Sequence, residues 1–152
     1  MGRTEGTHPI VVDDLWFYYA DEICALRGVS LSIEDGAFVA VIGQNGAGKT
    51  TLVKHFNGLL KPARGRVWIH GQDTREHSIG QLSQSVGYVF QNPDHQIFQP
   101  TTREEIEFGP RNLGLAPHKV KERSDEALEL FGLTHHEDRP PALLGFGLRR
   151  KV

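Results

Sequence analysis

Alternating hydrophobic and polar positions in the first part of the chain predict β-strands. Residues 10–19 are rich in β-branched and aromatic side chains, a composition that is typical of a strand. Residues 26–33 alternate apolar residues with glycine and serine, and this period of two predicts a strand with one buried face. Residues 34–36, Glu-Asp-Gly, predict a turn at its end.

Three other stretches are apolar without a clear alternation. Residues 37–42 are apolar throughout, which is typical of a strand that is covered on both faces in a parallel sheet. Residues 66–70 and 86–90 predict two further strands, and Gln91 follows the second of them directly. The stretch 92–94, Asn-Pro-Asp, is expected to prevent that strand from continuing.

Apolar positions three and four residues apart predict helices. Residues 49–57 have such a spacing, with Gly58 placed to end the helix, and residues 79–85 predict a short helix. Thr102 and Glu105 have the spacing of a capping box at the start of another helix, which Pro110 is expected to bend or end.

A last long helix is predicted to begin at Pro117 and to be capped by Gly132. Its inner side is predicted to carry four residues: Val120, Ala127, Leu128 and Phe131.

Composition narrows the class of protein. The 152 residues carry a net charge of -2, with 24% charged and 38% hydrophobic residues, as in an ordinary globular domain. No apolar run is long enough for a membrane span, and no secretory signal is expected at the N-terminus. Cys24 is the single cysteine, which excludes a disulfide within the chain. Glycine stands out, with 17 residues against a usual share of about 7%.

Several of these glycines lie in one motif between a predicted strand and a predicted helix. Residues 43–50 fit the pattern G-x-x-x-x-G-K-[ST], and this context makes a chance match improbable. Gly43, Gly46 and Gly48 allow a tight turn whose amides point at phosphate oxygens, aided by the helix N-terminus. In such loops the lysine, here Lys49, reaches the β- and γ-phosphates, and the hydroxyl of Thr50 can bind Mg²⁺.

Further motifs narrow the class of phosphate-loop protein. The first motif is a group of aromatic residues within 15–19, followed by Ala-Leu-Arg-Gly-Val-Ser-Leu at 25–31. The second is the run Gln-Asn-Pro-Asp-His-Gln-Ile-Phe, which begins at Gln91. The third is the segment 144–152, in which glycines are followed by basic residues. Together these motifs resemble the ATP-binding subunit of ABC transporters, over about residues 10–152. The run after Gln91 is most similar to the energy-coupling-factor and cobalt/nickel uptake branch.

The resemblance implies a role for each matching residue. Tyr19, or as the second choice Tyr18, would stack on the adenine ring, a contact that discriminates little between bases. Lys49 and Gln91 would act in catalysis, and Thr50 and Gln91 would bind Mg²⁺. The residues implied to surround the nucleotide are Tyr19, Gly43, Asn45, Gly46, Ala47, Gly48, Lys49, Thr50, Thr51 and Gln91.

The segment 144–152 aligns with the signature of the family, Leu-Ser-Gly-Gly-[Gln/Glu], but departs from it. Gly145 stands where the family has serine, Phe146 replaces the first glycine and Leu148 replaces the polar residue. Gly145 and Gly147 would touch ATP that is bound to a partner subunit. A missing serine hydroxyl would remove a hydrogen bond to a charged phosphate, worth about 1.5–3 kcal/mol.

The resemblance implies an α/β fold: an ABC-type P-loop NTPase core with an antiparallel β subdomain and the start of a helical subdomain. The expected division is a flexible arm at 1–9, a nucleotide-binding core and β subdomain at 10–91 and a helical subdomain at 92–152. No apolar strand ending in Asp-Glu and no switch histidine segment follows the phosphate loop, so later core strands are expected to be missing. We then expect very slow hydrolysis, an exposed strand at 37–42 and marginal stability.

The implied function is ATP binding, with Mg²⁺, by the energising subunit of an importer for metal ions or vitamins. Its expected partners are a transmembrane subunit, which contacts the loop after Gln91, and a second ATP-binding subunit, at the cytoplasmic face of the plasma membrane. The alternative is a truncated nucleotide-binding or dimerisation module without turnover. An unrelated kinase or GTPase fits less well, since the base-reading Asn-Lys-x-Asp is missing. The eight histidines have no metal-binding spacing and are expected at the surface.

Overall fold

The computed structural model describes residues 8–20, 23–92, 94 and 96–152. It divides the chain into two compact units, Met1–Tyr88 and Val89–Val152, and each is considered by itself. Most of the predicted arm at 1–9 lies outside the described residues.

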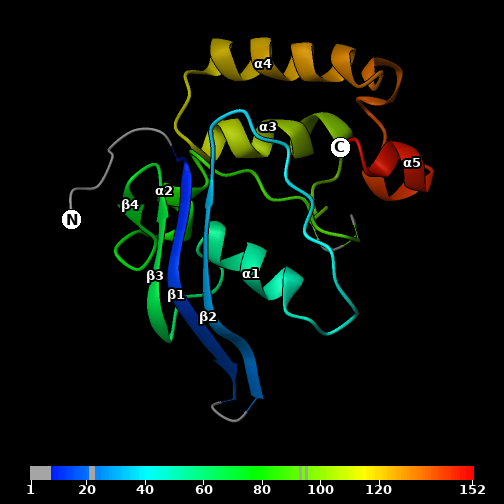
Figure 1. Ribbon diagram of the computed structural model, residues 1–152. Helices are drawn as coiled ribbons and strands as arrows, with labels where there is room; N and C mark the ends of the chain where they lie inside the picture. The colour runs from blue at the N-terminus through cyan, green and yellow to red at the C-terminus, as the bar shows by residue number, and fades with distance from the viewer. Residues whose placement is uncertain (1–7, 21–22, 93, 95) are drawn as a thin grey trace. The chain divides into compact units, whose positions relative to one another are not determined.

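The first unit contains an antiparallel sheet of four strands in the order β2-β1-β3-β4 (Figure 1). The strands predicted at 10–19, 26–33 and 66–70 are confirmed, and the second and third begin a few residues earlier than predicted. The strands are β1 (Ile10–Tyr19), β2 (Ile23–Ile33), β3 (Arg64–Ile69) and β4 (Gln72–Asp73).

The register of the sheet changes where β1 is irregular. Between Asp13 and Trp16 the pairing of β1 with β3 shifts, and Asp14 has a positive φ of 45°. Gly65 faces this irregularity with a φ of 82°, and a Cβ there would lie 2.1 Å from the carbonyl oxygen of Asp14. Only glycine allows β3 to approach β1 this closely.

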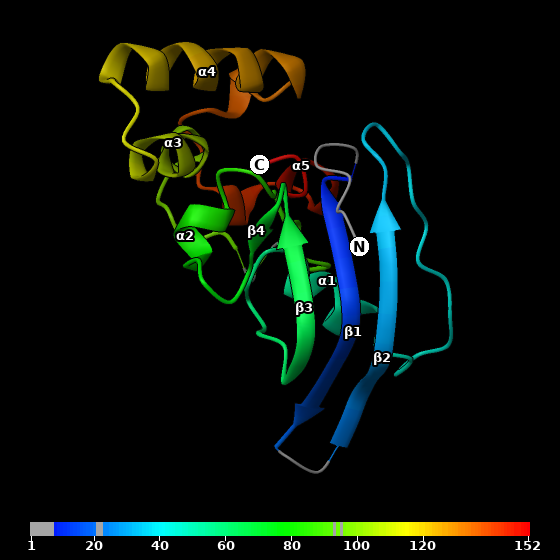
Figure 2. The same cartoon turned by 60° about the vertical axis from the view of Figure 1, so that its left-hand side comes forward.

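Helix α1 (Lys49–Phe56) covers one face of the sheet (Figure 2), and the turn at 34–36 leads from β2 into the segment before it. The short helix α2 (Ile79–Leu82) begins with a capping box between Ser78 and Gln81. Apolar side chains from the sheet and both helices form the core of the unit: Val12, Leu15, Leu26, Leu52, Phe56, Val67, Ile69 and Leu82.

The strands predicted at 37–42 and 86–90 do not form, and both predictions are wrong for this structure. Phe38 is fully exposed and Ile42 is 91% exposed. A strand needs a neighbouring strand that satisfies its backbone groups, and the sheet described above, β2-β1-β3-β4, does not include either segment. Both segments have the composition of buried strands, but strand formation also requires a neighbouring strand.

The second unit is helical, and α3 and α4 lie side by side in both views (Figures 1 and 2). Its apolar core consists of Val120, Leu128, Leu133 and Leu144. Its helices are α3 (Thr102–Asn112), α4 (Pro117–Leu130), η2 (Thr134–His136), η3 (Pro141–Leu143) and α5 (Phe146–Arg149).

Three details of these helices differ from the predictions. Thr101, not Thr102, caps α3, because its side chain accepts from the backbone N–H of Glu104 while Thr102 is buried. Helix α3 continues past Pro110 to Asn112, since a proline near the C-terminal end removes a hydrogen bond from the last turns only. Phe131 is 45% exposed, because it follows the end of α4 and leaves the apolar face that Val120 and Leu128 share.

Candidate functional site

The loop 43–48 leads into α1 with two residues in the left-handed conformation, Gly46 (φ 83°) and Gly48 (φ 84°). A Cβ on Gly48 would lie 2.7 Å from the carbonyl oxygen of Ala25 and 2.9 Å from the Leu26 side chain. Gly48 is therefore required by its backbone angle and by its close approach to β2.

The N-terminus of α1 is open for an acceptor. Its N-cap is Gly48, which has no side chain to occupy the first amides, and the first turn contains no acidic residue. The positive end of the helix dipole and unoccupied N–H groups together favour an anion.

Lys49 adds a positive charge at the same place. Its ammonium donates to the carbonyl oxygens of Gly43 and Gln44, each at 2.8 Å. The amide of Ala47 donates to Gln44 at 3.2 Å, which tightens the loop around the ammonium. The side chain is half-buried. The loop thus holds one cation beside the helix N-terminus.

The two threonines that follow point in different directions. Thr50 is exposed, whereas Thr51 is 7% exposed and belongs to the buried side of α1. The hydroxyl groups of Thr51 and Tyr19 share a hydrogen bond of 3.2 Å. The structure therefore brings Tyr19, at the end of β1, to the first turn of α1.

Tyr19 is exposed on one side and supported on the other. It is 41% exposed, and its ring meets that of Phe17 edge to face at 4.9 Å between centroids. Tyr18, the alternative for base stacking, is 38% exposed. Tyr19 is the one of the two whose hydroxyl is joined to α1.

His55 is a residue of this region that sequence reasoning missed. It has no exposed surface, so the prediction that the histidines lie at the surface is wrong for it. Its Nδ1 donates to the carbonyl oxygen of Thr51 at 2.7 Å, and its ring meets that of Phe17 at 4.9 Å. Burial lowers the pKa of His55, and hydrogen bonds to the backbone of Thr51 and Lys61 oppose this only in part. Its spacing from Thr51 and Leu52 could have placed it on the buried face of α1.

Gln91 and the signature glycines belong to the second unit. Gln91 is exposed at a bend. Gly145 is the N-cap of α5 and Gly147 lies in its first turn, and no heavy atom lies within 4 Å of a Cβ built on either residue. Both glycines present their backbone to open space.

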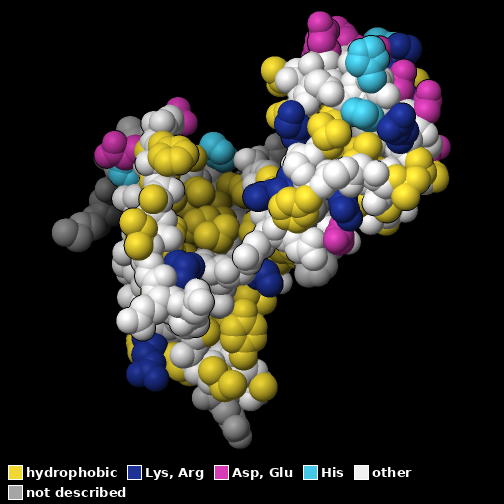
Figure 3. Space-filling view, turned by 90° about the vertical axis from the view of Figure 1, so that its right-hand side faces the viewer, with side chains coloured by type: hydrophobic (Ala, Val, Ile, Leu, Met, Phe, Trp, Pro, Cys, Tyr) yellow, Lys and Arg dark blue, Asp and Glu magenta, His cyan; other side chains and the backbone are white. Residues whose placement is uncertain are grey.

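The segment that follows Gln91 is tied to α5. Asp94 accepts a hydrogen bond of 2.6 Å from Arg149, and Phe98 meets Phe108 edge to face at 4.6 Å. Beside these contacts is a cavity of about 800 Å³ whose lining is aromatic and basic. Its lining includes Phe90, Phe98, Phe108, Phe131, Arg149, Arg150 and Lys151. Figure 3 shows that hydrophobic side chains are exposed on the surface of the protein.

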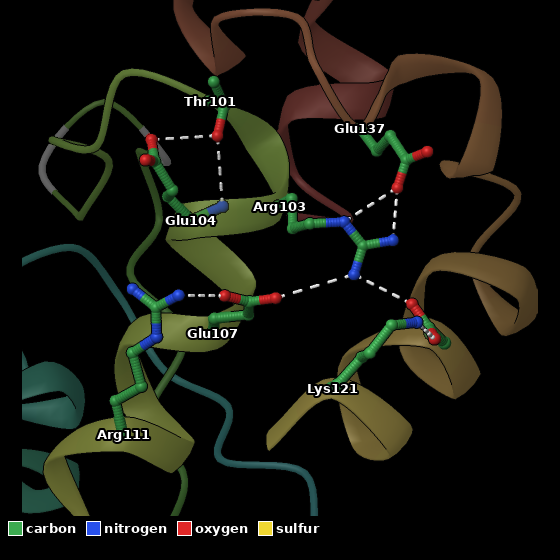
Figure 4. A network of polar contacts seen from close by, with 8 residues as sticks. Thr101, Arg103, Glu104, Glu107, Arg111, Lys121 and Glu137 are labelled. Atoms are coloured by element: carbon green, nitrogen blue, oxygen red, sulfur yellow. Dashed lines mark hydrogen bonds and ion pairs between the residues drawn. The ribbon is translucent and has the colours of Figure 1, made fainter. Parts of the chain in front are cut away.

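Charged side chains connect α3, α4 and the residues after α4 (Figure 4). Arg103 is the centre, with Asp125 at 2.8 Å, Glu107 at 3.5 Å and Glu137 in direct contact. Hydrogen bonds to Asp125 and then Glu137 raise the pKa of Arg103, and Lys121 and Arg103 lower the pKa of Asp125. Every charge in this network has an opposite charge beside it, as expected of a group that holds helices together.

Two kinds of feature are absent from the part of the chain that the structure describes. No helix there is long and apolar enough to cross a membrane. No group of three or more metal-binding side chains is found there either.

Comparisons with known proteins give a consistent result. The family model described as ABC transporter matches residues 26–152. A putative ABC transporter ATP-binding protein of Pyrococcus furiosus is 50% identical over 143 residues, which are 94% of this chain and 55% of that protein. An energy-coupling factor transporter ATP-binding protein of Methanothermobacter thermautotrophicus is 48% identical over 145 residues, 94% of this chain and 47% of that protein. The chain spans about half the length of these curated relatives.

Solved structures show the same likeness. One is cbiO1 of Clostridium perfringens, part of an ABC transporter complex, with a TM-score of 0.82 and 34% identity over 96% of this chain and 59% of that one. Another is a dimeric ATP-binding cassette with ADP and Pi, with a TM-score of 0.75 over 94% of this chain and 68% of that one. At 23% identity the second comparison concerns the fold alone.

Proposed function

The chain belongs to the ABC transporter family, and on this premise we propose that it binds ATP with Mg²⁺ within the energising subunit of an importer. Its fold is a partial P-loop ABC fold, with an antiparallel sheet and helices. The observation that carries the proposal is the glycine-bounded N-terminus of α1 with the Lys49 ammonium beside it.

The phosphate groups of ATP would bind in the loop from Gly43 to Thr51, which includes Asn45, Gly46, Ala47 and Gly48. The amides at the start of α1 supply donors, and Lys49 would exchange the carbonyl oxygens that it now contacts for the β- and γ-phosphates. The exchange replaces neutral acceptors with charged ones, and hydrogen bonds to charged groups are the stronger kind.

Tyr19 would stack on adenine. Its ring is partly exposed, lies next to the first turn of α1 and is supported from one side by Phe17. Stacking on an aromatic ring contributes about 1–3 kcal/mol per base and tolerates different bases.

Mg²⁺ would be held by the Thr50 hydroxyl together with phosphate oxygens, and the family resemblance implies the Gln91 side-chain carbonyl as a further ligand. Hard oxygen donors suit this ion, and both side chains are exposed. When bound, Mg²⁺ neutralises charge on the phosphates. Gln91 and Lys49 are the residues we assign to the reaction, which is hydrolysis of ATP in the working transporter.

The proposed partner subunits contact residues of the second unit. A transmembrane subunit would contact the segment after Gln91, which places the protein at the cytoplasmic face of the plasma membrane. Gly145 and Gly147 would face ATP on a second ATP-binding subunit, and their open surroundings support this. The solute class, metal ions or vitamins, is inferred from the energy-coupling factor and cbiO1 relatives.

Binding and turnover are tested separately. Titration with ATP and Mg²⁺, followed by calorimetry, is expected to show binding that Lys49→Ala weakens at least about tenfold, since a charged hydrogen bond is worth about 1.5–3 kcal/mol. Lys54→Ala on the same helix is the matched control and should bind as the unchanged protein does. Equal affinity of the Lys49 and Lys54 variants would exclude the proposed phosphate site.

Phosphate release measured in the same samples decides the alternative function. Release that Lys49→Ala abolishes supports an ATPase. Binding without release identifies a nucleotide-binding module without turnover, in keeping with glycine at the serine position of the signature.

A further inference from the structure

We propose that His55 is a positioning residue of the nucleotide site, which together with Phe17 holds Tyr19 in a fixed orientation against the first turn of α1. This inference rests on the proposed function in one respect only: the base of the nucleotide is taken to stack on Tyr19. The arrangement of the four side chains is a property of the free protein.

The four residues form a closed ring of contacts. His55 donates to the Thr51 carbonyl at 2.7 Å, and the Thr51 hydroxyl meets the Tyr19 hydroxyl at 3.2 Å. The rings of Tyr19 and Phe17 meet at 4.9 Å, with an interplanar angle of 86°. The rings of Phe17 and His55 close the circuit, also at 4.9 Å, with an angle of 78°.

Two of the four contacts, Thr51–Tyr19 and Phe17–His55, join α1 to β1. The other two lie within one element and support the residues that make those contacts. Phe17 and Tyr19 lie on β1, whereas Thr51 and His55 lie one turn apart on α1. Edge-to-face ring contacts are favourable beyond the area that they bury. The orientation of the Tyr19 ring is therefore determined before any ligand binds.

The burial of His55 separates its effect from that of Tyr19. Tyr19 is 41% exposed and available to a ligand, whereas His55 has no exposed surface. A substitution at His55 therefore affects the base indirectly, through neighbours such as Phe17, Thr51 and Tyr19. Such pre-organisation raises affinity because less freedom of the side chain is lost on binding.

Two variants separate the two contacts of His55, the hydrogen bond to Thr51 and the ring contact with Phe17. His55→Phe keeps an aromatic ring against Phe17 and removes the donor to Thr51. His55→Asn keeps a donor close to the position of Nδ1 and removes the ring. His118→Phe is the matched control, since His118 is exposed in the second unit.

The decisive comparison uses ATP and inorganic triphosphate, which has no base. We expect His55→Phe to weaken ATP about threefold to tenfold, which corresponds to one hydrogen bond, and to leave triphosphate within a factor of two. His55→Asn is expected to weaken ATP in the same selective way through loss of the ring contact. In a Tyr19→Ala background neither variant should weaken ATP further.

Equal losses for ATP and triphosphate would overturn the proposal, because they would show that His55 merely stabilises the loop. Unchanged ATP affinity in both folded variants would overturn it as well. If circular dichroism shows that one variant is unfolded, the same comparison of ATP with triphosphate is made with the other variant.

A measurement on the ligand-free protein keeps this inference distinct from the proposed function. Should the unchanged protein bind neither ligand, the proposed function fails, and the Tyr19 ring resonances then decide the inference. We expect them to shift in His55→Phe and in His55→Asn relative to His118→Phe. Unshifted Tyr19 resonances in both variants would overturn the inference by themselves.

Discussion

The two units differ in how charged side chains contribute to their packing. In the first unit the core is apolar, and residues such as Leu15 and Val67 are completely buried between the sheet and its helices. Between α3 and α4 of the second unit, Thr102, Glu107 and Ser124 are buried, and Arg103 connects acidic groups from three segments. Both units bury apolar side chains, and the first also buries His55, but only the second adds this partly exposed network of ion pairs, which salt weakens.

The two units also carry different parts of the proposed nucleotide and partner sites. The proposed phosphate loop and Tyr19 lie on the first unit, where Gly48 packs closely against β2 and Tyr19 is bonded to Thr51 of α1. The segment after Gln91 and the signature glycines lie on the unit whose helices are held by ion pairs. We therefore expect added salt to weaken the packing of the second unit more than that of the first.

The largest expected effect is the loss of a core side chain from the first unit. Leu15→Ala should lower the free energy of unfolding by about 2–5 kcal/mol, because it leaves a cavity where the side chain is fully buried. Urea unfolding followed by tryptophan fluorescence reports this unit, since Trp16 and Trp68, the two tryptophans of the chain, both lie in it. Leu130→Ala, at a side chain 78% exposed in the second unit, should change little. Similar effects of both variants on the fluorescence transition would contradict the apolar core described above.

Breaking the charge network is expected to have a smaller effect, confined to the second unit. Arg103→Met leaves Glu107, Asp125 and Glu137 without their shared partner and should cost about 1–3 kcal/mol, given the partial exposure of these groups. Amide hydrogen exchange in α3 and α4 measures the change. High salt should lower protection of these helices in the unchanged protein and have less effect in the variant.

Arg123→Met, on the exposed side of α4, is the matched control. If Arg123→Met and Arg103→Met reduce protection equally, the network does not hold the helices together.

The smallest expected effect is a dependence of the first unit on pH. Burial lowers the pKa of His55 below its value of 6.5 in the unfolded chain, so the unfolded chain takes up the proton more readily. Stability should therefore fall as the pH is lowered through about 6.5 and continue to fall until the pH reaches the pKa in the folded protein. Tryptophan-detected urea unfolding between pH 7.5 and 5 measures the slope, which His55→Phe should reduce. An unchanged slope in that variant would show that another group is responsible.

Local sequence signals predicted several of the elements from which the proposed site is built. The spacing of glycines and Lys49 predicted the phosphate loop ahead of a helix, and glycine is required at Gly48 by its positive φ and its contact with β2. Strand composition predicted β1 and alternation predicted β2, and the two form an antiparallel pair. The capping residue of α3 was predicted one position late, at Thr102, because threonines at 101 and 102 both precede an acidic residue by three positions and only the structure shows which is buried.

Longer-range features did not follow from local pattern. Residues 37–42 and 86–90 have the composition of buried strands, yet strand formation depends on a neighbour that may come from anywhere in a polypeptide. His55 was assigned to the surface as a polar residue, although its place on α1 buries it against Phe17, a contact across 38 positions of the chain.

The sequence by itself determined the motifs that place the chain in its family, and it predicted the residues that we propose for phosphate and base. These signals are local, because a backbone turn, a helix cap and the period of a strand depend on residues within a few positions of one another. Tertiary structure alone decided which of these residues meet. The Thr51–Tyr19 hydrogen bond and the rings that connect them through Phe17 and His55 exist only because an apolar core packs α1 against the sheet.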